Sequence, residues 1–480
     1  MIHGQLRPNG LKPILLSCLG VLLLASPAWA QPGVDRGGLG VYDEQLRVAL
    51  DDQMDQSREV GFDAGGWLNV AYFNYDDNAA GKKRQLMRYS ARGWASLNVN
   101  GVHEAYFRGL LEYDNWLAGG NPRNDRGDDF TETVERAWYQ FNLGQFMANR
   151  NGQYPAVGLK VRAGRQFMTI GTALALSVPM DAVRFDATSR VVDGMFFVGY
   201  NDRLTLNIDN SMAVGNEQKR SFLGAQATYK GFAQHRPFAY FFMQNDHSSP
   251  SPRSSTQKYD YESRYVGLGS TGTLMKDLTY STELVFEWGT TYGTNGGPGS
   301  SKCDISAMAF DAQLAYTFSE VYSKPKVMVE FLHGSGDGDR TRSPTATVGG
   351  NSPGSKDTSF NAFGYRDTGI ALSPVVSNMN IYMVGGSFFP LEKYKCFEKM
   401  EIGTKVFMYQ RDQSNGAISD SAATGGGAWV GSEWDVYCNW RITSDLAYTA
   451  RYGMFLPGSA YDGGDKSPQH FFYTGIVLSF

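Results

Sequence analysis

The chain closes with the stretch Phe471-Phe-Tyr-Thr-Gly-Ile-Val-Leu-Ser-Phe480, which has the two-residue period of a β-strand. Counting back in twos from the last residue gives a mostly apolar face: Phe480, Leu478, Ile476, Thr474 and Phe472. The terminal residues of soluble domains are usually polar and frayed. We therefore expect a terminal strand with one face against an apolar medium.

A short apolar run near the other end has the form of a secretory signal peptide. Arg7 and Lys12 flank the run Ile14–Leu24, and Ala28-Trp-Ala30 is a small-x-small cleavage site. The run is shorter than the ~20 residues that a membrane helix needs. We expect residues 1–30 to be a signal peptide.

The composition favours a membrane β-barrel over a large soluble enzyme. Among 480 residues there are 56 Gly, 27 Tyr, 29 Phe and 9 Trp, and 19% of residues are charged. Aromatic girdles and many turns are typical of transmembrane barrels. No other stretch approaches the ~18 consecutive apolar residues of a membrane helix. The formal net charge of −4 gives no bulk attraction for nucleic acid, so no nucleic-acid partner is expected.

Segments of roughly ten alternating residues recur from Gly61 to the end of the chain. In residues 84–99 one face is polar and the other is largely apolar. Period 2 alone fits a soluble sandwich as well as a membrane barrel, but the signal peptide, the terminal Phe and the strand lengths favour the barrel. The count is about 17 to 19, and bacterial single-chain barrels have even counts. We predict an all-β, transmembrane antiparallel β-barrel of 18 strands over residues 61–480, with 16 as the alternative.

Connector lengths alternate between short and long. Short turns such as Asn100-Gly101 would be periplasmic, and the long loops would be extracellular: Ala118–Phe130, Asn245–Lys258, Tyr292–Lys302, Ser335–Ser377 and Asp412–Gly431. The Ser335–Ser377 loop is too long for a simple hairpin, so it either folds inward and narrows the pore or is a mobile surface loop. Residues 31–60 would be a periplasmic leader that either forms a short helix, which we favour, or is disordered.

The run His333-Gly-Ser-Gly-Asp-Gly-Asp339 is the best candidate for chemistry. His333, Ser335 and Asp337 are the residue types of a hydrolase triad, but adjacency in a glycine-rich run does not supply spatial convergence. Asp337 and Asp339 would also suit Ca²⁺. A structural loop entrance is the favoured interpretation, so neither catalytic residues nor a metal site is predicted.

Cysteine spacing suggests no metal site and no cofactor. Cys303, Cys396 and Cys438 remain after signal cleavage, and an odd count leaves at least one thiol unpaired. A Cys396–Cys438 bridge is disfavoured because Cys438 falls on a lipid-facing register.

Alternation also assigns charges to the lumen. The N-terminal half would project a basic wall, and the later half an acidic wall. The pore-lining candidates are Arg88, Arg92, Arg108, Arg136, Lys160, Arg162, Arg184, Asp186, Glu262, Glu283 and Glu330. Rings of Arg and Lys favour anions. In the alternative interpretation these charges pair across neighbouring strands and stiffen the wall.

Short motifs from about residue 160 onward resemble the alginate-export type of outer-membrane porin. Gly164-Arg-Gln-Phe167, followed by Gly171 and Asp181-Ala-Val-Arg-Phe-Asp186, is similar to that family's paired signature. His333–Asp339 resembles its loop entrance, and Arg451–Ala460 resembles its loop before the last strand. Between the paired motifs, Thr172–Met180 is apolar where the family tends to carry Asp, Arg and Trp.

The resemblance implies an 18-stranded barrel whose basic constriction passes an anionic polysaccharide or another anionic solute. By position, Arg165 and Arg184 would belong to the basic lining, and Asp186 would pair with one of them. The final strand likewise resembles the C-terminal insertion signal of outer-membrane barrels, which implies outer-membrane lipids and, through Phe480, the barrel-assembly machinery as partners.

The sequence thus predicts a non-enzymatic channel (porin) of the bacterial outer membrane for the passive passage of hydrophilic, preferentially anionic solutes or polysaccharide. A hydrolase at the barrel rim and a structural or adhesive barrel are the alternatives. The oligomeric state is left open.

Overall fold

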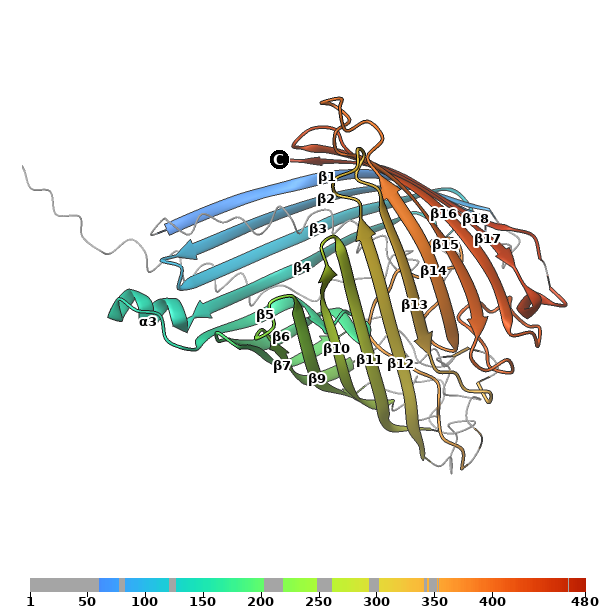
Figure 1. Ribbon diagram of the computed structural model, residues 1–480, viewed down its shortest axis with the longest axis horizontal. Coiled ribbons are helices and arrows are strands. Elements are labelled where there is room, and N and C mark those ends of the chain that lie inside the picture. Colours follow the sequence, from blue (N-terminus) through green and yellow to red (C-terminus); the bar gives the residue numbers. More distant parts are fainter. Residues whose placement is uncertain are drawn as a thin grey trace, which may run out of the picture.

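The computed structural model in Figure 1 describes residues 60–76, 83–120, 127–202, 219–247, 261–292, 302–340, 343–344, 352, 354–464 and 466–480. The expected signal peptide, all of the expected leader except Val60, and parts of the long loops lie outside these residues.

Eighteen antiparallel strands form one closed sheet, in which every strand pairs with its sequence neighbours and β1 pairs with β18. The predicted strand count is confirmed. The strands are β1 Val60–Asp76, β2 Arg84–Val99, β3 His103–Ala118, β4 Asp129–Asn142, β5 Gly158–Ile170, β6 Leu176–Thr188, β7 Val192–Asp202, β8 Lys219–Tyr229, β9 His235–Asp246, β10 Glu262–Met275, β11 Leu278–Tyr292, β12 Lys302–Thr317, β13 Lys326–Gly334, β14 Met379–Phe388, β15 Met400–Arg411, β16 Trp429–Arg441, β17 Leu446–Pro457 and β18 Gln469–Ser479.

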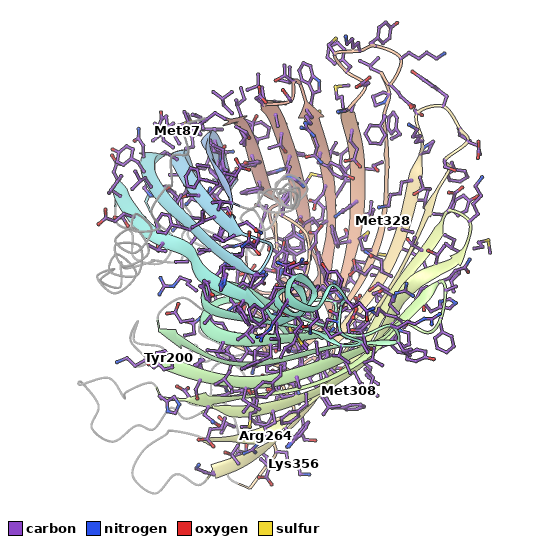
Figure 2. All side chains as sticks on the ribbon, turned by 90° about the vertical axis from the view of Figure 1, so that its left-hand side faces the viewer. Met87, Tyr200, Arg264, Met308, Met328 and Lys356 are labelled. Carbon is purple, nitrogen blue, oxygen red and sulfur yellow. The ribbon has the colours of Figure 1, made fainter. Side chains whose placement is uncertain are left out.

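The two faces of the sheet differ in polarity as alternation predicts. The outer face carries exposed apolar side chains, such as Tyr89 on β2 and Phe107 and Leu111 on β3. The inner face of β2 carries Arg88 and Arg92. This pattern is that of a barrel whose outside meets lipid and whose inside is polar. Side chains stand on both faces of the curved sheet in Figure 2.

The rim at which β1 begins and β18 ends is called the terminal rim, and the opposite rim the distal rim. Most connections at the terminal rim are short, but the β14–β15 connection spans residues 389–399, and the β4–β5 connection contains a helix that the sequence analysis did not predict. Helix α3, Leu143–Asn151, joins β4 to β5. Asn142 accepts a hydrogen bond from the Gln145 amide as the N-cap, and Gly152 ends the helix in the left-handed conformation.

A bulge in β4 turns the side chain of Glu135 inward, next to that of Arg136. Arg108 of β3 pairs with Arg136, but the next residue, Gly109, pairs with Val134, so Glu135 is the extra residue. Its carboxylate turns inward to the guanidinium groups of Arg92 and Arg108, at 2.9 Å from each.

Cys303, Cys396 and Cys438 are all free thiols.

No helix in the described part of the chain is long and apolar enough to cross a membrane.

Candidate functional site

The hairpin of β5 and β6 leaves the barrel wall halfway along its length. β4 pairs with β5 only from Ala137 to Asn142, and β6 pairs with β7 only from Asp181 to Thr188. Beyond these points the two strands pair only with each other, as far as Ile170 and Leu176. The distal half of the hairpin is therefore free to fold away from the wall.

The free half of the hairpin lies against the inner face of β7–β11. The Gly171 amide donates to Gln226 on β8 at 2.8 Å, and the Thr172 amide donates to Glu283 on β11 at 2.6 Å. The Tyr240 hydroxyl of β9 donates to the same carboxylate at 2.5 Å. These contacts reach several strands beyond β6, so the hairpin crosses the lumen side of this wall.

An apolar core fills the space between the hairpin and the wall. The hairpin contributes side chains that are completely buried: Met168, Ile170, Ala175, Leu176 and Met180. The wall contributes Phe197, Phe222, Tyr240 and Phe242. The apolar stretch Thr172–Met180, which departs from the family pattern, supplies much of this core. Burial of such side chains stabilises a contact by ~1.5–3 kcal/mol each.

The long β13–β14 connection also folds into the lumen, as one of the two sequence interpretations expected. The Asn361 amide donates to Glu287 of β11 at 2.9 Å. The amides of Ile370 and Ala371 donate to Glu433 of β16 at 2.6 Å each. The loop thus spans from one wall of the barrel to another.

The loop also makes charged contacts with the wall. Arg366 pairs with Asp311 of β12, and Asp367 pairs with Lys405 of β15. Inward carboxylates of β11, β12 and β16 are therefore buried beneath the loop and the hairpin, and they bind protein groups.

The two inserted segments are hydrogen-bonded to each other. The Ser177 amide donates to the Phe363 carbonyl at 2.9 Å, and the Phe363 amide returns a bond to Ala175 at 2.9 Å. The Tyr365 amide donates to the Ala173 carbonyl at 2.8 Å. A Cβ at Gly364 would overlap the carbonyl oxygen of Leu174, so this close approach requires glycine. Hairpin and loop together form one constriction.

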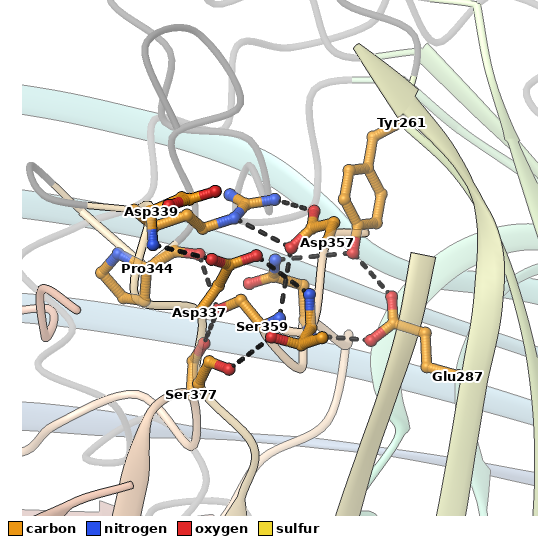
Figure 3. Close-up of polar contacts among 12 residues, drawn as sticks. Tyr261, Glu287, Asp337, Asp339, Pro344, Asp357, Ser359 and Ser377 are labelled. Carbon is orange, nitrogen blue, oxygen red and sulfur yellow. Dashed lines mark hydrogen bonds and ion pairs between the residues drawn. The ribbon is translucent and has the colours of Figure 1, made fainter. Parts of the chain in front are cut away.

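The loop is held in shape by its own polar network (Figure 3). Arg340 and Asp357 form a fully buried ion pair. The Ser359 hydroxyl donates to the Pro344 carbonyl at 3.0 Å. Asp337 accepts from the backbone amides of Asp339 and Thr358, and burial raises the pKa of the Asp337 carboxyl.

The suggested hydrolase set is not assembled. The His333 ring lies 2.8 Å from Asn380, and the Ser335 hydroxyl donates to the Thr358 carbonyl at 2.8 Å. The Asp337 carboxylate is bound to loop amides. Asp339 accepts from the Ser352 amide at 3.2 Å. Among the described residues, no group of three or more His, Cys, Asp or Glu side chains is arranged to hold a metal ion.

A polar row crosses the inner face of β3–β6. Register places Glu104 opposite Gln140, Gln140 opposite Arg162, and Arg162 opposite Arg184. Gln140 donates to Glu104 at 2.9 Å and accepts from Arg162 at 2.8 Å. The Arg162 guanidinium also lies 3.9 Å from the centre of the Trp138 ring.

Two further predicted residues lie beside this row. Lys160 is opposite Asp186 in register, and Asp186 binds Arg184 at 2.7 Å. Arg136 lies over the ring of Phe167, 5.9 Å from its centre. We call Arg136, Lys160, Arg162 and Arg184 the basic patch.

The other basic pore-lining candidates form ion pairs with carboxylates. Arg88 binds Asp114 at 2.7 Å, whereas Arg92 and Arg108 share Glu135. Arg165 binds Asp181 at 2.9 Å. Arg165 is on the strand face opposite Arg162, together with apolar Val161, so alternation alone does not place it with the basic patch.

The acidic candidates separate into two groups. Glu283 is completely buried beneath the hairpin, and Glu330 follows Met328 on the inner face of β13. Glu262 instead alternates with buried Ser263 and shares its face with Leu268, which is 51% exposed, so it lies on the outer face of β10.

The charges that the sequence analysis did not include as pore candidates have identifiable origins. Glu135 is turned inward by a bulge, which simple alternation does not detect. Glu433 follows the alternation of β16, but its partners belong to a distant loop. Arg366 belongs to that loop, where no period exists to assign a face.

The sequence matches the alginate export family over residues 208–473, which is more than half of the chain. The chain belongs to this family. No curated protein sequence matches it.

Solved porins share the fold of this family member. The Pseudomonas aeruginosa protein OccK8 (OprE) superposes with a TM-score of 0.52 at 11% identity, covering 87% of this chain and 98% of that one. The outer membrane protein OprD of the same organism gives a TM-score of 0.51 at 11% identity, covering 89% and 97%. At such identity the likeness supports the barrel architecture alone.

Family and architecture together identify an outer-membrane channel for the passage of a solute or polysaccharide, resident in the bacterial outer membrane. The outer face meets membrane lipids, and the polar lumen suits a hydrophilic solute.

Proposed function

We propose that this channel passes hydrophilic anions passively and that the basic patch provides the preference. The carrying observation is a local excess of positive charge on the inner face of β4–β6. Four cationic side chains of the patch face two carboxylates, Glu104 and Asp186. Positive charges that line a pore lower the energy of an anion in transit and raise that of a cation.

The burial of the carboxylates on the acidic wall supports the same preference for anions. Glu283, Glu287, Asp311 and Glu433 are 2% exposed or less, and they accept hydrogen bonds from the hairpin and the loop. Carboxylates bound in this way contribute less attraction to a passing cation than solvent-facing ones. The field along the remaining lumen is then dominated by the basic patch.

The family name denotes a polyanionic saccharide, which belongs to the proposed solute class. We propose the class of hydrophilic anions rather than alginate itself. The distal rim would face the cell exterior, and Phe480 would engage the assembly machinery. No covalent step is proposed, because the separate partners of His333 and Ser335 favour a structural role.

The test is ion selectivity in planar bilayers, measured as the reversal potential across a salt gradient. Wild-type channels should prefer anions, and the double variant Arg162→Gln/Arg184→Gln should lose most of that preference. One unit charge near the ion path is worth ~1 kcal/mol in water, so each substitution should lower the anion permeability and raise the cation permeability by about fivefold each.

The matched control is Lys276→Gln, which removes an exposed charge in the β10–β11 turn whose partner is Glu320. It should leave the reversal potential unchanged. A cation-selective wild type, or an unaltered potential in the double variant, would refute the proposal.

A further inference from the structure

The β5–β6 hairpin carries polar side chains on the face that a barrel normally turns to lipid. Nearest the terminal rim this face is apolar, with Val161 on β5 and Val183 and Phe185 on β6; the latter two are 40% and 37% exposed. At the last residues paired with the wall the same face carries Arg165 and Asp181. Beyond them it carries Phe167, Thr169, Ser177 and Pro179. The change in polarity coincides with the end of wall pairing.

The opposite face of the same segment is sealed. Gln166, Met168, Ile170 and Met180 are 1% exposed or less. In an ordinary barrel strand these inward positions would meet the lumen. Here they pack on the inner face of β7–β11. The hairpin therefore folds inward, so that its own inner face lies against the inner face of the neighbouring wall.

Folding of this kind reverses the environments of the two faces. The former inward face is buried against the wall, and the former outward face is turned toward the interior of the barrel. Phe167 on this face lies under Arg136, an inner-face residue of β4, which places the turned face opposite the basic patch. Charged and hydroxyl side chains are costly against hydrocarbon but not against water.

We propose that the turned face of the hairpin, formed by Arg165, Thr169, Ser177 and Asp181, is a second solute-contacting wall of the channel. It rests on the proposed channel function and adds a surface that strand alternation excludes. Asp181 has a side chain that is 51% exposed, and the Thr169 and Ser177 hydroxyls lie 3.5 Å apart at the surface. Such a strip suits a solute bearing hydroxyl groups, because every member both offers and accepts hydrogen bonds or carries a paired charge.

The test is thiol accessibility in the full-length protein, after Cys303, Cys396 and Cys438 are replaced by Ala. Thr169→Cys and Ser177→Cys are each introduced, and the protein is inserted in bilayers. A charged, membrane-impermeant methanethiosulfonate is added. Both variants should react rapidly, measured by mass, and each reaction should produce a stepwise loss of single-channel conductance.

Val161→Cys and Val183→Cys are the matched controls, because they lie on the same strands and on the same alternation face below the fold. Both should resist the reagent and keep full conductance. If Thr169→Cys and Ser177→Cys react as slowly as these controls, the turned face does not meet water and the proposal is overturned.

Rapid reaction without any loss of conductance would equally overturn it, because the strip would then face water outside the solute path. Neither result depends on whether the channel prefers anions or cations. Failure of this inference is therefore distinguishable from failure of the basic-patch proposal, which is measured by the reversal potential.

Discussion

The inward carboxylate of Glu433 holds the β13–β14 loop against the barrel wall through hydrogen bonds. Its two oxygens accept the amides of Ile370, Ala371 and Leu372, the last at 2.9 Å. The Tyr409 hydroxyl donates to the same carboxylate at 2.9 Å. Four donors around one buried carboxylate satisfy its lone pairs, so its charge is used to hold the loop.

Replacement of this carboxylate by an amide should loosen the constriction. Glu433→Gln exchanges one acceptor oxygen for an NH₂ group that faces backbone N–H donors. Each buried hydrogen bond left unmade costs ~1–3 kcal/mol. We expect a larger and noisier single-channel conductance, measured in planar bilayers, with an unchanged heat-modifiable gel mobility of the folded barrel.

The matched control is Glu401→Gln on the neighbouring strand β15, whose carboxylate has a 3.4 Å contact with Asn439. It should keep wild-type conductance. Equal behaviour of the two variants would show that the carboxylate of Glu433 does not hold the loop.

Sequence alternation assigns individual side chains only while the strand remains regular and its phase is known. Arg88, Arg92 and Glu283 follow the pattern because their strands are long and continuous. Glu135 escapes it because a bulge inserts one residue. Glu262 lies at the first position of β10, where little preceding pattern exists to set the phase.

At the scale of elements, the strands were predictable and their excursions were not. A strand needs only a local two-residue period, which the sequence carries throughout the barrel. The departure of the β5–β6 hairpin depends on where pairing with β4 and β7 stops, and neighbouring strands leave no local signal of that. Helix α3 has capping residues at both ends but little apolar periodicity, so pattern reading did not detect it.

The junction between hairpin and loop should fail when Gly364 acquires a side chain. Gly364→Val would drive its Cβ into the Leu174 carbonyl and separate the backbones that carry the Phe363 and Tyr365 hydrogen bonds. We expect new protease-sensitive sites in the loop, mapped by limited proteolysis and mass spectrometry of the folded barrel, together with increased conductance.

Gly338→Ala is the control within the same loop. A Cβ at that position meets only the Asn415 Cβ, at 4.0 Å, which is ordinary contact distance. It should preserve the wild-type cleavage pattern. Protection of the loop in Gly364→Val equal to that in the control would contradict the close approach at Leu174.

At the scale of the whole molecule, the closed sheet forms a rigid frame, and the hairpin and loop form the constriction inside it. The barrel is continuous through the β1–β18 seam, which runs from Trp67–Ser479 to Asp76–His470 and leaves no sheet edge there. The hairpin and loop lie within this rigid frame and bind separate parts of it, at Glu283 on β11 and Glu433 on β16. Because the two segments are also bonded to each other, we expect them to move as one unit.

A double-mutant cycle tests whether the hairpin and the loop move as one unit. Glu283→Gln should loosen the hairpin by weakening its contacts with Thr172 and Tyr240, and Glu433→Gln should loosen the loop. If the segments open together, either substitution releases most of the constriction, so the double variant should raise the conductance by less than the sum of the two single effects. Residues in one network typically show interaction energies of ~0.5–3 kcal/mol. Additive conductance changes would instead mean that the hairpin and the loop open independently, despite the backbone hydrogen bonds between them.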